Sequence, residues 1–394
     1  MQLNKEEAMK ILAVGGGSGG HVTPVAAVIT ELKSQSPGSE IRYWCDNKYG
    51  SEAKMTMREQ HSDVQIRTVV AGKFRRFHAI PIWTQLANFR SIVLPNTIDV
   101  FKIGIGTIQS LCRLVWWRPD VIFAKGGFVC LPVGIAAHIL RIPLVIHDSD
   151  THPGLTSRVL SRWAVSIGTG APLENYNYPA SKAHFVGIPV SKQLVVLGDS
   201  QRAALKQELG LSSRPLVLIT GGGLGAKRIN DATVAVADRL VADCTTLLVC
   251  GVGQYSELQD AVTHLSAKDF KLVPHVVSSE FVRLLSAADI VVSRAGATTM
   301  LELAALAKPT ILIPNARLTG GHQLKNANAY EKKHAAVIVN DEALETEPDV
   351  LATAIHELLA DTSMRERLAT AIHQFATPHA ARDMARLILA AKKH

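Results

Sequence analysis

Residues 11–20 read ILAVGGGSGG, a short apolar run followed at once by a glycine-rich turn. Four consecutive apolar residues suit a buried parallel strand, and the segment from Pro24 to Lys33 then predicts a helix. Strand, glycine turn and helix in this order form the unit from which parallel α/β sheets are built. The unit recurs at residues 215–241, where an apolar run ends in GGGLG and a helix is predicted over 230–241.

Further apolar runs extend the pattern in both halves of the chain. They predict strands at 41–45, 120–124, 143–147, 246–250, 290–293 and 310–314. We therefore expect an α/β protein with two Rossmann-like, doubly wound parallel-sheet domains that face a central cleft. The predicted domains are residues 1–188 and 189–372, and a basic helix at about 373–394 is expected to pack back on the first domain.

Composition excludes several classes of protein. The 394 residues are 47% hydrophobic and 19% charged, which is typical of packed domains and not of a disordered chain. The net charge of +8 suits an anionic substrate or membrane surface, but no dense basic stripe indicates a nucleic-acid partner. Five cysteines without a CxxC pair argue against a disulfide frame or a structural zinc. The polar N-terminus and the lack of a long uncharged apolar run predict a cytoplasmic protein without a signal peptide or a membrane span.

The first glycine turn suits a phosphate, because glycines allow close approach and the following helix offers free N–H groups. Gly15, Gly17 and Gly20 also match GxGxxG, and Asp46 supplies the acidic residue of a dinucleotide site, so a nicotinamide-dependent oxidoreductase is one interpretation. His21 is predicted to lie in the first turn of the helix, where the dipole favours a neutral imidazole that can act as a general base. A packing or capping histidine is the alternative.

The second glycine turn, Gly221–Gly225, predicts another anion cradle, unless it is only a tight strand-to-helix turn. Two cradles facing one cleft would hold a pyrophosphate through backbone amides and helix dipoles, without a metal. Asp148 and Asp150 form a formal DxD pair, which keeps a metal-binding interpretation open.

Residues 293–302 read SRAGATTMLE, the end of a strand followed by a helix that starts with small and hydroxyl residues. Glu302, one turn into this helix, suits the two hydroxyls of a ribose. His322 and Gln323, before a later helix, suit the hydroxyls of a sugar. A solvated surface glutamate and a capping role are the respective alternatives.

Residues 71–118 interleave cations with aromatic side chains, a composition typical of a membrane-interface surface. A pair of core helices with ordinary solvated charges explains the same composition, because tryptophan occurs in both settings. Both interpretations stay open.

Seven short motifs, in the same order, resemble those of the MurG glycosyltransferases. They are GGGSGGHVTP (15–24), KGGF (125–128), IHD (146–148), GLT (154–156), GIPV (187–190), GGGLGA (221–226) and SRAG (293–296). The resemblance implies the GT-B fold of glycosyltransferase family 28. It implies an inverting transfer of N-acetylglucosamine from UDP-N-acetylglucosamine to lipid I, undecaprenyl-pyrophosphoryl-N-acetylmuramoyl-pentapeptide, which gives lipid II for peptidoglycan synthesis.

The resemblance also implies partners and a location. The partners are a UDP-sugar, a polyprenyl-pyrophosphate-linked acceptor and the anionic surface of the bacterial cell membrane, where the protein would be peripheral on the cytoplasmic face. No cofactor or metal is required.

The resemblance assigns site residues by position. His21 matches the catalytic histidine, the N-terminal domain binds the acceptor, and the C-terminal domain binds the donor. The donor-binding positions are Gly221, Gly222, Gly223, Leu224, Gly225, Arg294, Gly296, Ala297, Thr298, Glu302, His322, Gln323 and Ser191. The acceptor- and phosphate-binding positions are Gly16, Gly17, Ser18, Gly19, Gly20, Gly126, Gly127 and Asp150. The membrane-docking positions are Phe74, Phe77, Trp83, Trp116 and Trp117.

The chain departs from the family pattern at several of these positions. Residues 147–150 read HDSD in place of the usual HEQN, and the second glycine turn has GLG in place of SQG. His322 replaces the first of two glutamines, and Ser191 replaces an arginine. The rivals are another GT-B transferase with a different sugar or lipid, the oxidoreductase, and a non-catalytic scaffold that binds a lipid-linked sugar.

Overall fold

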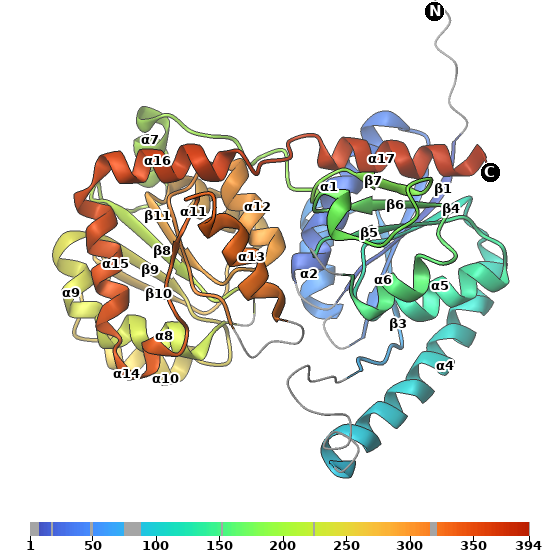
Figure 1. Cartoon of the computed structure of the whole chain (residues 1–394), viewed down its shortest axis with the longest axis horizontal. Helices are drawn as coiled ribbons and strands as arrows, with labels where there is room; N and C mark the ends of the chain where they lie inside the picture. Colours follow the sequence, from blue (N-terminus) through green and yellow to red (C-terminus); the bar gives the residue numbers. More distant parts are fainter. Residues whose placement is uncertain are drawn as a thin grey trace, which may run out of the picture. The chain divides into compact units, whose positions relative to one another are not determined.

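The computed structural model of the chain describes residues 8–16, 19–47, 50–74, 88–150, 153–223, 225–315 and 321–393. Two compact units divide the chain (Figure 1). Unit 1 comprises Met1–Ser191 with Thr377–His394, and unit 2 comprises Lys192–Ala376. The predicted boundaries at 188 and about 372 lie within four residues of these positions.

Unit 1 contains a seven-stranded parallel sheet, sheet A, in the order β3-β2-β1-β4-β5-β6-β7. Its strands are β1 (Lys10–Val14), β2 (Glu40–Asp46), β3 (Gln65–Val69), β4 (Val121–Ala124), β5 (Leu144–Asp148), β6 (Ser166–Thr169) and β7 (Ala183–Phe185). Its helices are α1 (Gly19–Gln35), α2 (Gly50–Gln60), η1 (Phe89–Val93), α4 (Leu94–Trp116), α5 (Cys130–Ile139), α6 (Leu155–Leu160), η2 (Leu173–Asn175), α17 (Ala380–Ala390) and η5 (Ala391–Lys393).

The central strand β1 is buried on both faces, which explains its continuous apolar run. Ile11 and Ala13 pack in one core with residues of α1 and α17. Leu12 and Val14 point to the opposite face, where residues of α4 and α5 form a second core. The α1 helix begins at Gly19, five residues before the predicted start at Pro24, so it includes the end of the glycine turn.

Unit 2 contains a six-stranded parallel sheet, sheet B, in the order β10-β9-β8-β11-β12-β13. Its strands are β8 (Leu216–Thr220), β9 (Thr245–Val249), β10 (Phe270–Val273), β11 (Ile290–Ser293), β12 (Thr310–Leu312) and β13 (Val337–Ile338). Its helices are α7 (Asp199–Glu208), α8 (Lys227–Ala235), α9 (Ala237–Asp243), α10 (Tyr255–Gln259), η3 (Asp260–Val262), α11 (Ser278–Ala287), α12 (Ala297–Ala305), α13 (His322–Glu331), α14 (Ala343–Thr346), α15 (Asp349–Ala360) and α16 (Thr362–His373). The predicted pair of doubly wound parallel sheets is therefore confirmed.

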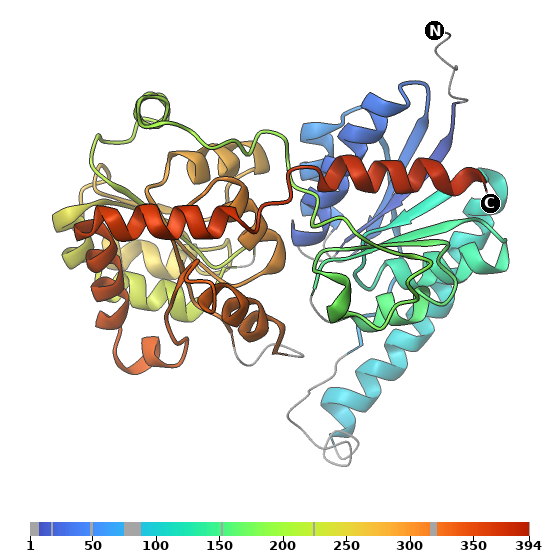
Figure 2. The same ribbon diagram turned by 45° about the horizontal axis from the view of Figure 1, so that its top comes forward.

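The last helix, α17, returns to unit 1 and lies along α1 (Figure 2). Met384, Ala385 and Ile388 enter the core that α1 shares with sheet A, and Gln35 Nε2 donates a hydrogen bond to Arg382 O (3.3 Å). Gly168 of β6 leaves room for this helix, because a Cβ there would lie 2.7 Å from Met384 Sδ.

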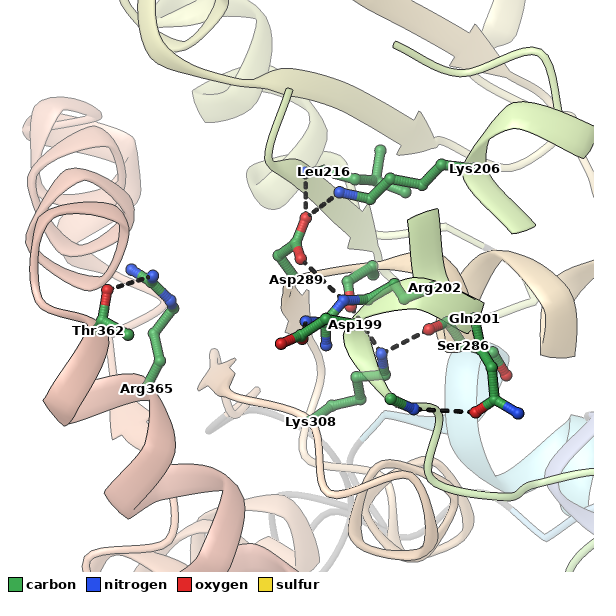
Figure 3. Close-up of polar contacts among 12 residues, drawn as sticks. Asp199, Gln201, Arg202, Lys206, Leu216, Ser286, Asp289, Lys308, Thr362 and Arg365 are labelled. Atoms are coloured by element: carbon green, nitrogen blue, oxygen red, sulfur yellow. Dashed lines mark hydrogen bonds and ion pairs between the residues drawn. The ribbon is translucent and has the colours of Figure 1, made fainter. Parts of the chain in front are cut away.

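Buried charges organise the amino edge of sheet B, where the strands begin (Figure 3). Asp289, just before β11, accepts hydrogen bonds from Lys206 Nζ (2.5 Å) and the backbone N–H of Leu216 (2.7 Å). Lys308, just before β12, donates to the carbonyls of Ser286 (2.6 Å) and Ala288 (2.7 Å) at the end of α11. Burial lowers the pKa of Lys308 to about 7. This cluster fixes the edge of the sheet opposite to the one described next.

Candidate functional site

The two sheets share one topology, and each has a point where the strand order reverses. In sheet A this switch point lies between β1 and β4, and in sheet B it lies between β8 and β11. Ligands of open α/β sheets bind outside the carboxyl ends of the strands at such points. The glycine turns predicted to hold phosphates follow β1, β4 and β8, so all three lie at a switch point.

At the carboxyl edge of sheet A, the first glycine turn is packed so tightly at Gly16 that a side chain has no room there. A Cβ at Gly16 would lie 2.5 Å from Asp46 Oδ2 and 3.3 Å from Val129 Cγ1. Tyr43 OH donates a hydrogen bond to Gly15 O (2.5 Å), which holds the turn from the neighbouring strand. Asp46 is buried against this turn, so its carboxylate is not placed to bind the ribose that the oxidoreductase interpretation requires.

The second turn at this edge follows β4. Gly126 and Gly127 have φ of +99° and +81°, a conformation that glycine adopts without strain, and α5 begins three residues later. Asp150, in the turn after β5, is half-buried, and Tyr176 OH donates to its carbonyl (2.7 Å). These three predicted acceptor-site residues therefore lie at the ends of the adjacent strands β4 and β5.

Part of the predicted site lies outside the described residues. Gly17, Ser18 and Leu224 are not described. Gly19, Gly20 and His21 form the first turn of α1, but the burial of these residues and the contacts of the His21 side chain are not described. The predicted place of His21, in the first helical turn after the glycines, is confirmed.

At the carboxyl edge of sheet B, the glycine turn after β8 also depends on close backbone approach. A Cβ at Gly221 would lie 2.3 Å from Ala226 N, and one at Gly225 would lie 2.0 Å from Cys250 O. The exposed Gly222 and Gly223 form the outer part of the turn, and Gly222 has φ of +88°. Among the described side chains, none caps the start of α8, so its first N–H groups are left for an anion.

The α12 helix starts in the same way beside this turn. Its N-cap residue is Gly296, where a Cβ would meet nothing within 4 Å, and no described side chain caps the helix. Ala297 and Thr298 form its first turn and are half-buried. The switch point of sheet B thus presents two open helix N-termini, from α8 and α12.

Glu302 lies in α12, one turn beyond these residues. No hydrogen bond or ion pair joins its carboxylate to any other described residue. Burial alone raises its pKa to about 7. An isolated, desolvated carboxylate is a costly group in a folded protein, and hydroxyl donors from a ligand would stabilise its charged form.

Arg294, predicted to bind the donor, is held by protein groups on both sides of the turn after β11. Its Nη1 donates to Asp341 Oδ1 (2.5 Å) and to Ile313 O (3.0 Å), and Arg228 Nη1 of α8 donates to Asp341 Oδ2 (2.7 Å). The buried Asp341 thus joins the turn after β11 to the start of α8. Arg294 positions the donor-site elements, and sequence reasoning missed Asp341 because VNDE reads like an ordinary solvated loop.

His322 and Gln323 open α13, next to the end of β12. Gln323 Oε1 accepts a hydrogen bond from Asn315 N (2.8 Å), so this side chain holds the end of the loop that precedes α13. His322 Nδ1 is buried and has no hydrogen-bond partner among the described residues. Ser191 ends the first segment of unit 1, whereas the other residues predicted to bind the donor belong to unit 2.

The predicted docking residues separate in the structure. Trp116 is 86% exposed, whereas Trp117 is 6% exposed and packs in the core beneath Arg42, whose guanidinium lies 4.0 Å from the ring centroid. The docking role predicted for Trp117 is therefore wrong, because its ring is already covered by protein. Phe74 is half-buried against the same core. Phe77 and Trp83 lie outside the described residues.

The α4 helix, which carries Trp116, buries both polar and apolar residues on its inner side, Leu114 among them, and exposes apolar residues on its outer side. Asp99, Gly106 and Ser110 are buried, and a Cβ at Gly106 would lie 1.9 Å from Val70 O. The exposed apolar residues recur every three or four positions as far as Ile108, continue at the end of the helix and define the α4 stripe: Leu94, Ile98, Phe101, Ile105, Ile108, Val115 and Trp116. So many exposed apolar residues are not expected for a helix on a water-exposed surface.

One helix among the described residues, Arg90–Trp116, is long and apolar enough to cross a membrane. No membrane span is predicted from the sequence, because Lys102 and Arg113 interrupt the apolar run. Core helices of soluble proteins pass the same test, so this finding shows only length and composition.

Within the described ranges, no three His, Cys, Asp or Glu side chains form a group that could hold a metal ion. Asp148, one half of the DxD pair, has a buried carboxylate that accepts a hydrogen bond from Tyr178 OH (2.8 Å).

Comparisons with known proteins agree with this geometry. Residues 11–169 match the glycosyltransferase family 28 N-terminal domain, and residues 216–385 match the C-terminal domain of the same family. A protein of Listeria monocytogenes is 33% identical over 98% of this chain and 100% of its own length, and one of Clostridium perfringens is 33% identical over 86% and 87%. Both are named UDP-N-acetylglucosamine–N-acetylmuramyl-(pentapeptide) pyrophosphoryl-undecaprenol N-acetylglucosamine transferase.

Solved structures show the same fold. The crystal structure of Acinetobacter baumannii MurG is 23% identical, with a TM-score of 0.67 over 97% of this chain and 99% of that one. A UDP-GlcNAc 2-epimerase from Neisseria meningitidis, solved with UDP-GlcNAc bound, is 14% identical, with a TM-score of 0.69 over 97% and 100%.

Proposed function

The chain belongs to the MurG family of glycosyltransferase family 28, and we propose how its two sheet edges carry out the reaction of that family. The enzyme transfers N-acetylglucosamine from UDP-N-acetylglucosamine to lipid I and forms lipid II for peptidoglycan synthesis. Its two Rossmann-like domains are those of the GT-B fold. The predicted cleft between the domains stays a prediction.

Unit 2 binds the UDP-sugar in this proposal. The diphosphate lies against the N–H groups of the Gly221–Gly225 turn and the open N-termini of α8 and α12, whose dipoles favour negative charge. The ribose diol donates hydrogen bonds to Glu302. The Asp341 link keeps α8 and the turn after β11 in register, so that both helix ends act on one diphosphate.

Unit 1 binds the acceptor, whose pyrophosphate lies against the glycine turns after β1 and β4. His21 assists removal of the proton from the acceptor hydroxyl as that oxygen attacks the anomeric carbon. One bond forms as the bond to UDP breaks, so the configuration inverts. The leaving diphosphate is stabilised by fixed backbone dipoles, and this chemistry needs no metal.

One observation carries the donor side of the proposal, namely the isolated carboxylate of Glu302. Glu302 is half-buried, and a partly desolvated carboxylate without a partner lowers the stability of the unit; a ribose supplies the two hydroxyl donors that it lacks.

The test is UDP release with a lipid I analogue, measured with UDP-N-acetylglucosamine, UDP-glucose, UDP-galactose and UDP-N-acetylgalactosamine, each with and without EDTA. We expect strong preference for UDP-N-acetylglucosamine and no effect of EDTA. Turnover with another donor alone would assign a different donor substrate to the enzyme. Turnover that EDTA abolishes would show that the reaction requires a metal ion. UDP binding without turnover with any pair would favour a scaffold.

We infer in addition that the α4 stripe attaches the enzyme to the membrane surface. The residues of the stripe are uncharged. The exposed cations Lys73 and Arg90 precede it in the sequence, Lys102 lies within the same helix, and Arg118 follows it. An apolar helix face with basic neighbours suits the interface of an anionic bilayer, where the acceptor lipid resides.

The double variant Phe101→Glu, Ile105→Glu is expected to lower the bound fraction on phosphatidylglycerol vesicles at least tenfold, because two charges replace inserted apolar area. UDP affinity should stay unchanged, since the stripe belongs to unit 1. Sedimentation of the protein with vesicles measures the bound fraction, and Val252→Glu, an exposed valine of unit 2, is the control. Normal vesicle binding with a changed oligomeric state would instead identify the stripe as a self-association surface.

A further inference from the structure

A buried lysine lies at the switch point of sheet A. Lys125 follows β4 and is 1% exposed, and its Nζ donates a hydrogen bond to Ser149 Oγ in the turn after β5. Its backbone N–H donates to Val14 O (2.9 Å) at the end of β1. Lys125 therefore ties together the ends of three neighbouring strands, immediately before the Gly126-Gly127 turn.

Two carboxylates face this lysine. Burial lowers the pKa of Lys125 to about 8, against the attraction of Asp150 and Asp148. Burial raises the pKa of Asp148 to about 7, and repulsion from Asp150 adds to this effect. The hydrogen bond from Tyr178 and the charge of Lys125 oppose it.

Three other groups face this cluster from the elements around it. Cys130 of α5 lies near Lys125, Ser157 of α6 hydrogen-bonds Asp148, and Tyr176 lies near both carboxylates. None of these groups supplies a second positive charge. Among the groups described around this cluster, Lys125 is the cation whose charge acts directly on the acids.

Holding an ammonium group and two carboxylates together in a largely buried place lowers the stability of the fold. An ammonium taken out of water loses hydration that one hydroxyl does not replace, and each buried carboxylate loses hydration as well. An apolar residue at position 125, with neutral residues at 148 and 150, would fill the same space at lower cost. The cluster also lies at the edge that binds the acceptor, where perturbed groups are most often functional.

We propose that Lys125 is a positioning residue of the acceptor site, which holds the Ser149-Asp150 turn and places its ammonium group beside Asp148 and Asp150 where the acceptor binds. The inference rests on the proposed function, because the acceptor is taken from it. Asp150 is half-buried, whereas Lys125 and Asp148 are fully buried, so Asp150 is the member that reaches the acceptor hydroxyls. Lys125 acts through it.

The test is Lys125→Met, which keeps the length of the side chain and removes its charge. We expect the KM for a lipid I analogue to rise at least tenfold, while the KM for the donor and the Kd of UDP stay unchanged. The acidic limb of kcat/KM should move to higher pH, because Asp148 without the nearby ammonium binds its proton more tightly. Adding Asp148→Asn should restore part of the acceptor affinity, since it removes the uncompensated carboxylate.

The matched control is Lys308→Met, which removes a second buried lysine at the opposite edge of the other sheet (Figure 3). It should lower the melting temperature without changing the acceptor KM or the pH profile. The inference is overturned if Lys125→Met behaves in the same way.

A second variant covers the case in which Lys125→Met does not fold. Ser149→Ala removes the hydrogen bond between Lys125 and the turn but keeps every charge. It should raise the acceptor KM without moving the acidic limb, and an unchanged KM would overturn the inference. A wild-type protein that transfers nothing overturns the proposed function and this inference together, whereas normal wild-type transfer with an unaffected Lys125→Met overturns the inference alone.

Discussion

Glu302→Gln is expected to weaken UDP binding roughly 10- to 100-fold at pH 8, because hydrogen bonds to a charged group contribute about 1.5–3 kcal/mol. The carboxylate accepts from both ribose hydroxyls in the proposed complex. The amide of the variant has only one acceptor atom, and its NH2 group donates toward hydroxyls that must then reorient. Isothermal titration with UDP measures the loss directly.

The same group should make UDP binding depend on pH in the wild type. Since burial raises the pKa of Glu302 to about 7, protonation below that pH removes the acceptor charge. The affinity for UDP should then decrease by up to roughly tenfold for each pH unit below this value, whereas the affinity of Glu302→Gln should lack this dependence on pH. Glu366→Gln, an exposed glutamate of α16, is the control and should behave like the wild type. Wild-type affinity in Glu302→Gln at pH 8 would contradict the proposed contact.

The free energy of unfolding should change with pH in the opposite direction to the affinity for UDP. The pKa of Glu302 is higher in the folded chain than in the unfolded chain, so the folded state holds its proton over the range between about 4.5 and 7. The free energy of unfolding therefore decreases as pH rises through this range, and above it the half-buried charge destabilises unit 2. Glu302→Gln should raise the melting temperature at pH 8 and leave it unchanged at pH 4. A residue that weakens the fold and strengthens ligand binding is typical of a binding site.

Most of the fold could be predicted from the sequence, because the central strands are buried on both faces and read as continuous apolar runs. The predicted strand at 290–293 coincides with β11, and the other predicted strands agree within two residues. The strands β3, β6, β7, β10 and β13 were missed, since they lie at or next to the sheet edges and are short or carry polar residues. The helix predicted at 230–241 is divided at Val236 between α8 and α9, in a stretch without glycine or proline.

The site was predictable where chemistry leaves a pattern in adjacent residues. Glycine turns and the spacing from Gly296 to Glu302 are such patterns, because close backbone approach and one helical turn have fixed lengths. The partners of Arg294 and Lys125 were not predictable, since Asp341 and Ser149 reach them only through the order of strands in the sheet. Trp117 was assigned to the wrong surface for a different reason: adjacent residues at the end of a helix point in different directions, so Trp116 is exposed and Trp117 is buried.

His21→Ala is expected to lower kcat roughly 10²- to 10⁴-fold, the range typical of a lost acid–base group. His21 lies in the first turn of α1, directly after the glycine turn at the switch point of sheet A. The Kd of UDP should stay unchanged, because the residues proposed to bind UDP belong to unit 2. Single-turnover transfer to a lipid I analogue measures the rate, and His264→Ala, an exposed histidine of unit 2, is the control.

A second substitution separates the two roles that His21 can have. Asparagine forms hydrogen bonds but does not accept a proton near neutral pH, so His21→Asn keeps a positioning contact and removes a base. If His21 takes the proton, His21→Asn should lose as much rate as His21→Ala and lose the acidic limb of the kcat profile. If His21 only orients the acceptor hydroxyl, the asparagine variant should recover most of the rate with the limb intact. A normal kcat in His21→Ala would exclude both roles and leave Asp150 as the acidic group at this edge to be tested as the proton acceptor.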